Sequence, residues 1–335
     1  MSESCPVVNS EKNLITFLNL STIAAEELCT PLTNTTWLFA YSNDIDANYF
    51  EEMMEMPYFS LAASHIVKFA NVRFDVQEQE NIEYHDNADD MRDSYEQRWP
   101  NPEKGFKSED TGSDIITVLN KFLNNTQAPV CGSKISILLK RNPNVADMNQ
   151  IIALLKKYRV SIYVVCSKNP IGERNSTDMY KIATQTNGVA LFFDDEDFNR
   201  GLSEMSAFSN AFNIYAEHFN VSSQDTRNLK QITFPHSGSY LFVCSVYDRP
   251  QSPTLRSLRL NWTDTKTGVT GSSLADPSSI EKLKGNFHRD LNQFSKGTYN
   301  MTISYDYSDN IMRQLYIRFY TMDEQPVDYW VPYDN

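Results

Sequence analysis

The sequence predicts an α/β domain with a doubly wound, mostly parallel sheet, followed by an antiparallel β-sandwich. Two observations lead to this fold class. Residues 134–193 alternate three apolar strand patterns with two amphipathic helix patterns, an order typical of a parallel sheet covered by helices on both faces. Beyond residue 229 the hydrophobic pattern changes from helical spacing to alternation, which indicates half-buried antiparallel strands.

The alternating segment of the first domain has clear element boundaries. The helix pattern at 145–159 ends in basic residues, which suit the negative end of the helix dipole. The shorter helix pattern at 178–186 is followed by Asn187-Gly188, a pair typical of a helix C-cap. The apolar strand patterns are at residues 134–139, 160–166 and 189–193.

The part of the chain before residue 134 is less regular. Residues 47–69 have a helical pattern, with a break expected at Pro57 because proline interrupts helical hydrogen bonding. Residues 86–111 are polar and contain Trp99, which indicates a long excursion over the surface. The other predicted elements are helices at 12–28 and 113–123 and strands at 35–41, 72–76 and 82–84.

The first domain is predicted to close with a long amphipathic helix at 198–219. The polar stretch after it has the composition of a linker. In the sandwich, residues 315–320 show the alternation of a strand clearly, with Tyr316, Arg318 and Tyr320 on one face. The expected organisation is a lead-in at 1–33, an α/β domain at 34–220, a linker at 221–228 and an Ig-like β-sandwich at 229–335.

Composition argues against two classes of function. The 335 residues carry a net charge of −13, whereas sequence-independent nucleic-acid binding needs a basic footprint. No apolar run approaches the roughly 20 residues of a membrane-spanning helix. The first residues contain neither a basic region nor an apolar core, so no secretory signal is visible. We therefore expect either an intracellular protein or a chain without its natural start.

The cysteines give no metal-binding spacing, because the chain contains no C-x-x-C pair. Their number is five, which is odd, so at least one thiol stays free or pairs between chains. Cys166 and Cys244 fall in apolar strand patterns and are expected to be buried. Cys5 and Cys29 flank the predicted lead-in helix and are the candidate disulfide pair.

N-glycosylation motifs point to an extracellular location. Two of them lie on alternating strands, where Asn261 and Asn300 fall between apolar residues and should therefore face solvent. A glycan fits at such a position, so we expect an extracellular protein. The motifs are at Asn19, Asn34, Asn124, Asn175, Asn220, Asn261 and Asn300.

Residues 34–220 resemble a von Willebrand factor type A domain, the Rossmann-like module of many extracellular adhesion proteins. A type A-like domain followed by a sandwich is also similar to uncharacterised secreted proteins of nematodes. The segments that carry the resemblance are the strand at 36–41, the helix start at 112–119, the strand at 135–139, and the runs 154–165 and 179–188.

The resemblance implies a metal-ion-dependent adhesion site, in which oxygen ligands hold a cation that binds a carboxylate of the partner. In the family these ligands are an Asp-x-Ser-x-Ser motif, a Thr and a later Asp. The corresponding positions here are residues 41–45, Ser113 and Arg141. Only Asn43 and Ser113 keep a coordinating oxygen, and Arg141 places a positive charge where the metal would be. We therefore expect neither a metal nor another cofactor.

A binding surface is expected at the carboxyl ends of the strands, where open α/β sheets place their ligands. The ligand would be a protein or a glycan, because Tyr- and Trp-rich surface suits such contacts. The surface excursion at 86–111, with Trp99, is expected to be part of this rim. The other residues expected on it are Ser42, Asn43, Asp44, Ser113, Arg141 and Asn142.

Two other functions stay open at this point. A magnesium-dependent phosphotransferase would use Asp44 as its nucleophile, because Asp44-x-Asp46 follows an apolar strand. Alternatively, the sandwich binds carbohydrate and the first domain presents it. The further residues that the phosphotransferase would use are Ser167, Lys181, Asp194 and Asp195.

Asp44, Asp46, Asn48 and Glu55 also have the spacing of a calcium-binding loop. The glycine that such a loop needs is replaced by Tyr49, so we attribute the spacing to an acidic helix start with Asp44 or Asp46 as N-cap. The interpretation that we favour is a non-enzymatic, extracellular interaction protein of the adhesion type.

Overall fold

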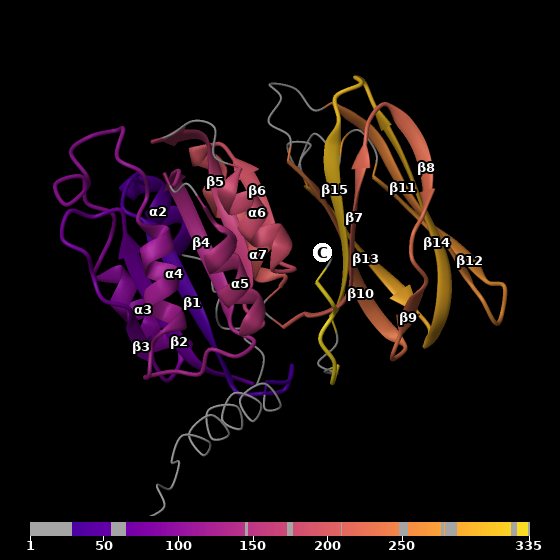
Figure 1. Cartoon of the computed structure of the whole chain (residues 1–335), viewed down its shortest axis with the longest axis horizontal. Coiled ribbons are helices and arrows are strands. Elements are labelled where there is room, and N and C mark those ends of the chain that lie inside the picture. Colours follow the sequence, from indigo (N-terminus) through magenta and orange to yellow (C-terminus); the bar gives the residue numbers. More distant parts are fainter. Residues whose placement is uncertain are drawn as a thin grey trace, which may run out of the picture.

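The computed structural model shows an α/β domain packed against a β-sandwich (Figure 1). The predicted lead-in helix, Pro57, Cys5, Asn19 and Asn175 lie outside the residues that the structure describes. The described residues are 29–54, 65–144, 147–172, 177–208, 210–247, 254–275, 278, 287–322 and 327–333.

The first domain contains a six-stranded sheet with the order β3-β2-β1-β4-β5-β6. Neighbouring strands run parallel except for β3, which is antiparallel to β2. This order is that of a doubly wound sheet and confirms the predicted fold class. The strands are β1 (Thr35–Ser42), β2 (Ile66–Phe74), β3 (Glu83–His85), β4 (Lys134–Arg141), β5 (Ser161–Ile171) and β6 (Val189–Phe193).

Helices cover both faces of this sheet because its strands alternate apolar side chains between two cores. On one face, Phe39 and Tyr41 pack with α2, α3 and α7, and on the other face Leu38 and Ala40 pack with α4, α5 and α6. The helices are α2 (Ala47–Met54), α3 (Ala88–Glu96), α4 (Ile115–Leu123), α5 (Asn149–Lys157), α6 (Asp178–Gln185) and α7 (Phe198–Ser206), with a short 3₁₀ turn η1 (Asp195–Asp197) before α7.

The predicted end of α6 is confirmed. Asn187 has a φ of 58°, in the left-handed region, and the Gly188 amide donates to the carbonyl of Ala183. Gly188 lies directly against β5, so a Cβ at this position would come within 1.8 Å of the Ile162 carbonyl oxygen. This contact explains why the turn needs glycine there.

The second domain is an antiparallel β-sandwich. One sheet has the order β13-β10-β15-β7, and the other has the order β12-β11-β14-β8, with β9 also paired to β14. Aromatic side chains fill the space between the sheets, where the rings of Phe234 and Phe294 stack 4.1 Å apart. The strands are β7 (Phe212–Val221), β8 (Gln224–Asn228), β9 (Ile232–Phe234), β10 (Gly238–Val246), β11 (Leu255–Asp264), β12 (Thr270–Ala275), β13 (Phe287–Phe294), β14 (Gly297–Tyr307) and β15 (Arg313–Thr321).

The predicted domain boundary is wrong, because the second half of the predicted helix at 198–219 is a strand. Helix α7 ends at Ser206, and β7 then pairs with β15 along its length. The predicted linker at 221–228 is β8, which pairs with β14. Aromatic and β-branched residues in β7 favour an extended chain once a partner strand is available. The chain therefore passes between the domains at residues 207–211.

A second correction concerns the predicted helix at 47–69. Helix α2 is described as far as Met54, and residues from Ile66 onward form β2, which pairs with β1. The long-range strand pairing outweighs the local helical pattern. No helix in the described part of the chain has the length and apolar composition needed to cross a membrane.

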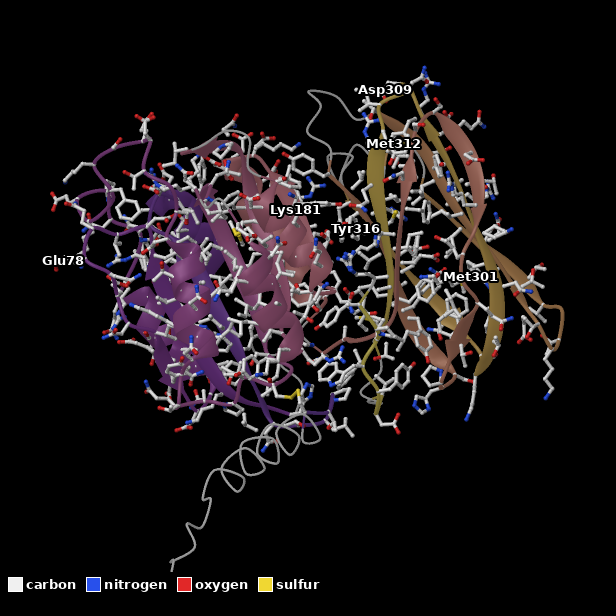
Figure 2. The ribbon with its side chains drawn as sticks, viewed as in Figure 1. Glu78, Lys181, Met301, Asp309, Met312 and Tyr316 are labelled. Carbon is white, nitrogen blue, oxygen red and sulfur yellow. A yellow bond between two sulfur atoms is a disulfide. The ribbon has the colours of Figure 1, made fainter. Side chains whose placement is uncertain are left out.

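The two domains pack directly against each other through the outer face of β15. The Tyr320 hydroxyl donates to the Asn187 carbonyl at 2.9 Å, and the rings of Tyr316 and Tyr180 lie 5.6 Å apart. Figure 2 shows Tyr316 on the side of β15 that faces the α/β domain. The central strands β10 and β15 of the four-stranded sheet are thus buried on both faces. In β15, the face that alternation would assign to solvent is an interdomain contact.

The predicted Cys5–Cys29 pair is wrong, because Cys29 forms its disulfide with Cys131. This bond connects the residues before β1 with the residues before β4, at the amino ends of two neighbouring strands. The C-terminal segment 327–333 covers it, with the Trp330 indole donating to the Cys29 carbonyl at 2.8 Å. Cys166 and Cys244 are buried, as predicted, and neither forms a disulfide.

Candidate functional site

The predicted rim residues lie where the sequence places them, at the carboxyl ends of β1 and β4. Because these two strands are parallel neighbours, Asp44 and Arg141 meet at one edge of the sheet. The Arg141 Nε donates to Asp44 Oδ2 at 2.7 Å, and Nη2 reaches Oδ1 at 3.4 Å. An internal ion pair therefore occupies the carboxyl edge of the sheet.

The remaining donors of Arg141 are used by the covering segment 98–111. Its Nη1 donates to the carbonyls of Ser108, Glu109 and Thr111 at 3.0, 3.2 and 2.6 Å. The ring of Phe106 lies over the guanidinium, 5.5 Å from its centre. The side chain of Arg141 is only 2% exposed. Its positive charge is satisfied by one carboxylate and three carbonyl dipoles.

The same segment also closes over Asn43. The Asn43 amide donates to the Asn101 carbonyl at 2.9 Å, and its carbonyl accepts from the Asn101 backbone amide at the same distance. The Tyr41 hydroxyl donates to the Arg98 carbonyl at 2.8 Å. Residues 98–111 are therefore a cover fixed by hydrogen bonds and not a free surface loop.

This cover closes most of the predicted rim. The rim residues are at the predicted positions, but most of them are buried: residues 98–111 supply the partners of Asn43 and Arg141, whereas the Ser42 hydroxyl donates to Asp75. The buried members of the rim are Ser42, Asn43, Ser113, Arg141 and Asn142, and the side chain of Asp44 is 14% exposed.

A second buried carboxyl group, Asp75, lies next to this ion pair and was not among the predicted site residues. The Ser42 hydroxyl donates to Asp75 Oδ2 at 2.5 Å, and the Asp114 backbone amide donates to Oδ1 at 3.2 Å. Burial raises the pKa of Asp75 to about 8, partly offset by its hydrogen bonds to Ser113 and Ser42. The signal in the sequence is its position directly after β2, which ends at the same edge of the sheet as β1.

The residues of the phosphotransferase alternative are held by other partners. Asp44 is bound to Arg141, whereas Asp195 pairs with Lys140 and accepts the Ser167 hydroxyl at 2.5 Å. Lys181 is exposed on α6. Within the described ranges, no three His, Cys, Asp or Glu side chains lie together where they could hold a metal ion.

The calcium-loop spacing has the structural role that we assigned to it. Asp46 Oδ1 accepts the Asn48 backbone amide at 2.8 Å at the start of α2, as an N-terminal cap does. Asp44 points to Arg141 instead. Glu55 lies outside the described residues.

The glycosylation motifs that the structure describes are accessible to different degrees. Asn300 is exposed and Asn261 is half-buried, on neighbouring strands of the five-stranded sheet, where Asn300 pairs with Thr263. Gln231 and Thr302 contact these two asparagines at 3.2 and 3.4 Å. Both side chains point away from the sandwich core, as predicted. Three further motifs, at Asn34, Asn124 and Asn220, have exposed asparagines.

The fold and this site define a two-domain protein whose α/β sheet carries a buried ion pair at the carboxyl ends of its strands. A family model described as a domain of unknown function (DUF7154) matches residues 217–322, within the sandwich. The match begins inside β7, in agreement with a domain boundary before this strand. No curated protein matches the chain.

Several solved structures are similar in part. A von Willebrand factor type A structure from Catenulispora acidiphila covers 88% of this chain at 10% identity and a TM-score of 0.37, and this chain covers 59% of its length. The match to a carbohydrate-binding module of Cellvibrio mixtus lichenase 5A, in complex with cellotriose, covers 33% of this chain and 86% of the module, at 16% identity and a TM-score of 0.21. The match to the C-terminal domain of A223, a structural protein of Sulfolobus turreted icosahedral virus, covers 33% of this chain and 96% of that domain, at 15% identity and a TM-score of 0.20. We draw no function from these similarities.

Proposed function

We propose that this protein is a non-enzymatic, extracellular binding protein of the adhesion type, whose type A-like domain works without a metal ion. The observation that carries the proposal is the buried pair of Arg141 and Asp44 at the carboxyl edge of the sheet. The ligand would be a protein or a glycan bound on surface outside this closed edge.

Electrostatics explain why the ion pair is incompatible with a cation at this edge. Two unit positive charges about 4 Å apart repel each other by roughly 4 kcal/mol at an effective dielectric constant of about 20. A divalent ion beside Arg141 would meet about twice that repulsion. It would also have to displace Arg141 from Asp44 and from three carbonyl groups.

The same geometry disfavours the phosphotransferase. A nucleophilic carboxylate must face its substrate, and it must be free to form a covalent bond. Both oxygens of Asp44 face the guanidinium of Arg141, beneath the cover of residues 98–111. We therefore keep the non-enzymatic interpretation. No observation on the described residues favours carbohydrate binding by the sandwich over protein binding.

Two features support an extracellular location. The disulfide between Cys29 and Cys131 is of the kind that persists in oxidising compartments. The exposed motifs at Asn34, Asn124, Asn220 and Asn300 could all accept a glycan without disturbing the core.

The intact mass of natively expressed protein, measured before and after enzymatic removal of N-glycans, tests the location. We expect a decrease equal to several glycans, and a smaller decrease for Asn300→Gln. An unmodified protein with reduced Cys29 and Cys131 would refute the extracellular proposal. A magnesium-dependent phosphatase activity that disappears in Asp44→Asn would refute the non-enzymatic one.

A further inference from the structure

One buried arginine among the described residues has no acidic partner. Among the described residues four arginines are buried, and three of them pair with a carboxylate: Arg73 with Glu80, Arg141 with Asp44 and Arg313 with Asp309. Arg318 is the most buried of the four, at 1% exposure, and within the described part of the chain it forms no ion pair.

Arg318 lies on the outer face of β15, between the two domains. Its Nη2 donates to the Thr184 carbonyl at 3.3 Å, and its guanidinium lies over the Tyr316 ring, 5.2 Å from the centre. The Nε and Nη1 nitrogens have no hydrogen-bond partner among the residues that the structure describes. A guanidinium group normally uses its N–H groups on carboxylates, phosphates or carbonyls, so most of its capacity is unused here.

A buried charge without a counter-charge is strongly unfavourable, because the protein interior does not replace the water that the charge loses. Buried polar groups that lack a partner in a native fold call for a specific explanation, such as a bound ion or water. The ring of Tyr316 and one carbonyl compensate only part of the charge of Arg318. An anion bound beside it would supply the remainder.

The structure contains a cavity of about 170 Å³ at this place, between α5 and α6 of the first domain and β7 and β15 of the second. A water molecule occupies about 30 Å³ in the liquid, so the cavity is large enough for a small ion with several waters. The side chains at its boundary are mostly polar. The lining residues are Lys156, Thr184, Gln185, Asn187, Ala216, Glu217, His218, Gln314, Tyr316, Ile317 and Arg318.

The charges in this lining favour an anion. Lys156, a second cationic residue, lines the cavity from α5, and its Nζ lies over the Tyr333 ring, 5.4 Å from the centre. Glu217 is the one acid among the lining residues, and its Oε2 already accepts the Tyr215 hydroxyl and the Lys230 backbone amide. A cavity lined by two cations is notable in a chain of net charge −13.

We propose that this interdomain cavity binds a small oxyanion, a carboxylate or phosphate group, with Arg318 as its anchor and Lys156 as a second contact. The site is independent of the function proposed above. Because its walls come from both domains, the anion would bind only when the sandwich and the α/β domain are docked.

Thermal unfolding of the full chain in inorganic phosphate, compared with chloride at equal ionic strength, tests the proposal. We expect Tm to rise with phosphate concentration, by about 2 °C or more once the concentration is far above Kd. Acetate and sulfate series distinguish the two sources of the oxyanion, because a carboxylate site responds to acetate and a phosphate site responds to phosphate and sulfate.

Three variants show whether the response comes from this cavity. We expect Arg318→Met to lose it and Lys156→Gln to need about tenfold more anion, as expected for one lost charged contact. Lys266→Gln, a matched loss of charge at an exposed turn of the sandwich, should respond like the wild type. The proposal is overturned if no anion raises the Tm of the wild type above its value in chloride, or if Lys156→Gln responds as fully as Lys266→Gln. Lys156 is only half-buried, so this second criterion holds even if Arg318→Met fails to fold.

Discussion

Arg141 and Arg318 are almost equally buried, yet their surroundings differ in kind. Arg141 has a carboxylate, three carbonyl groups and an aromatic ring around its guanidinium. Arg318 has one carbonyl, one aromatic ring and an adjoining cavity. The first is a closed site whose internal charges neutralise each other. The second is a site that still lacks a counter-charge.

The difference shows how a position typical of ligand binding can become part of the core. The carboxyl edge of a doubly wound sheet is where such folds bind ligands. In this protein the pair of Arg141 and Asp44 and the covering segment 98–111 occupy that edge. The polar site with space for a ligand is instead at the interface of the two domains.

The largest expected effect separates these two arginines directly. Arg141→Met should lower the free energy of unfolding by about 3–5 kcal/mol, because Asp44 keeps a buried charge without a partner. Arg318→Met should be close to neutral or stabilising in chloride buffer, because it leaves no carboxylate behind. Chemical denaturation of both variants measures the difference. Equal losses of unfolding free energy would contradict the distinction between the two arginines.

Removing both charges of the buried ion pair tests whether Asp44 and Arg141 stabilise each other. The double variant Asp44→Asn, Arg141→Met should recover part of the stability that Arg141→Met loses, since no unpaired charge remains. A double variant whose loss equals the sum of the two single losses would show that the two residues do not interact. Denaturation curves of the three variants give the coupling free energy.

Removal of the disulfide tests how much the covalent link at the amino ends of β1 and β4 contributes to stability. The bond between Cys29 and Cys131 closes a sequence separation of 102 residues. Its loss in the double variant Cys29→Ser, Cys131→Ser should lower the free energy of unfolding by about 2–5 kcal/mol. The response of Tm to phosphate should persist, because the cavity at Arg318 does not include either cysteine. Thermal unfolding of this variant in phosphate and in chloride checks both statements.

A pH dependence is expected from Asp75, beside the closed site. The pKa of Asp75 is about 8 in the folded protein, against 3.8 for an unperturbed aspartate, so the folded state binds the proton more tightly than the unfolded chain does. The protonated Asp75 therefore stabilises the folded state fully below about pH 4. Its contribution to the free energy of unfolding decreases by up to about 1.4 kcal/mol per pH unit and is lost as the pH rises through 8. Asp75→Asn keeps the shape and tolerates the φ of 63°. This variant should show a flatter stability profile between pH 5 and 8, and an unchanged profile would contradict the assignment.

The smallest effect concerns the docking of the two domains. Tyr320→Phe removes the hydrogen bond to the Asn187 carbonyl and should lower the free energy of unfolding by about 1 kcal/mol. Because the cavity needs both domains, the same variant should weaken the response of Tm to phosphate slightly. Parallel thermal scans of Tyr320→Phe and the wild type measure both changes.

The sequence predicted the elements whose pattern is local. The strands and helices between residues 134 and 193 were found because apolar positions repeat within each element. Strand β7 was missed because its extended form depends on β15, whose Thr321 pairs with Phe212 more than a hundred residues earlier in the chain. The Cys29–Cys131 bond was missed for the same reason, since nothing local distinguishes Cys131 from Cys5 as the partner of Cys29.

The candidate site was predicted in part. Parallel strands end at a common edge, so the positions of Asp44 and Arg141 followed from the strand pattern alone. Their burial did not follow, because it depends on backbone carbonyls of residues 108, 109 and 111, which carry no side-chain signal. The alternation in β15 located the face of Arg318 but could not distinguish solvent from a second domain.

Calorimetric titration of the wild-type protein with Mg²⁺ and Mn²⁺ tests the proposal that the first domain works without a metal ion. We expect no binding heat above that of dilution for either ion, and no change when Asp44 is replaced by Asn. A one-site isotherm in the wild type that Asp44→Asn abolishes would contradict it, because Asp44 would then be a metal ligand and not the partner of Arg141.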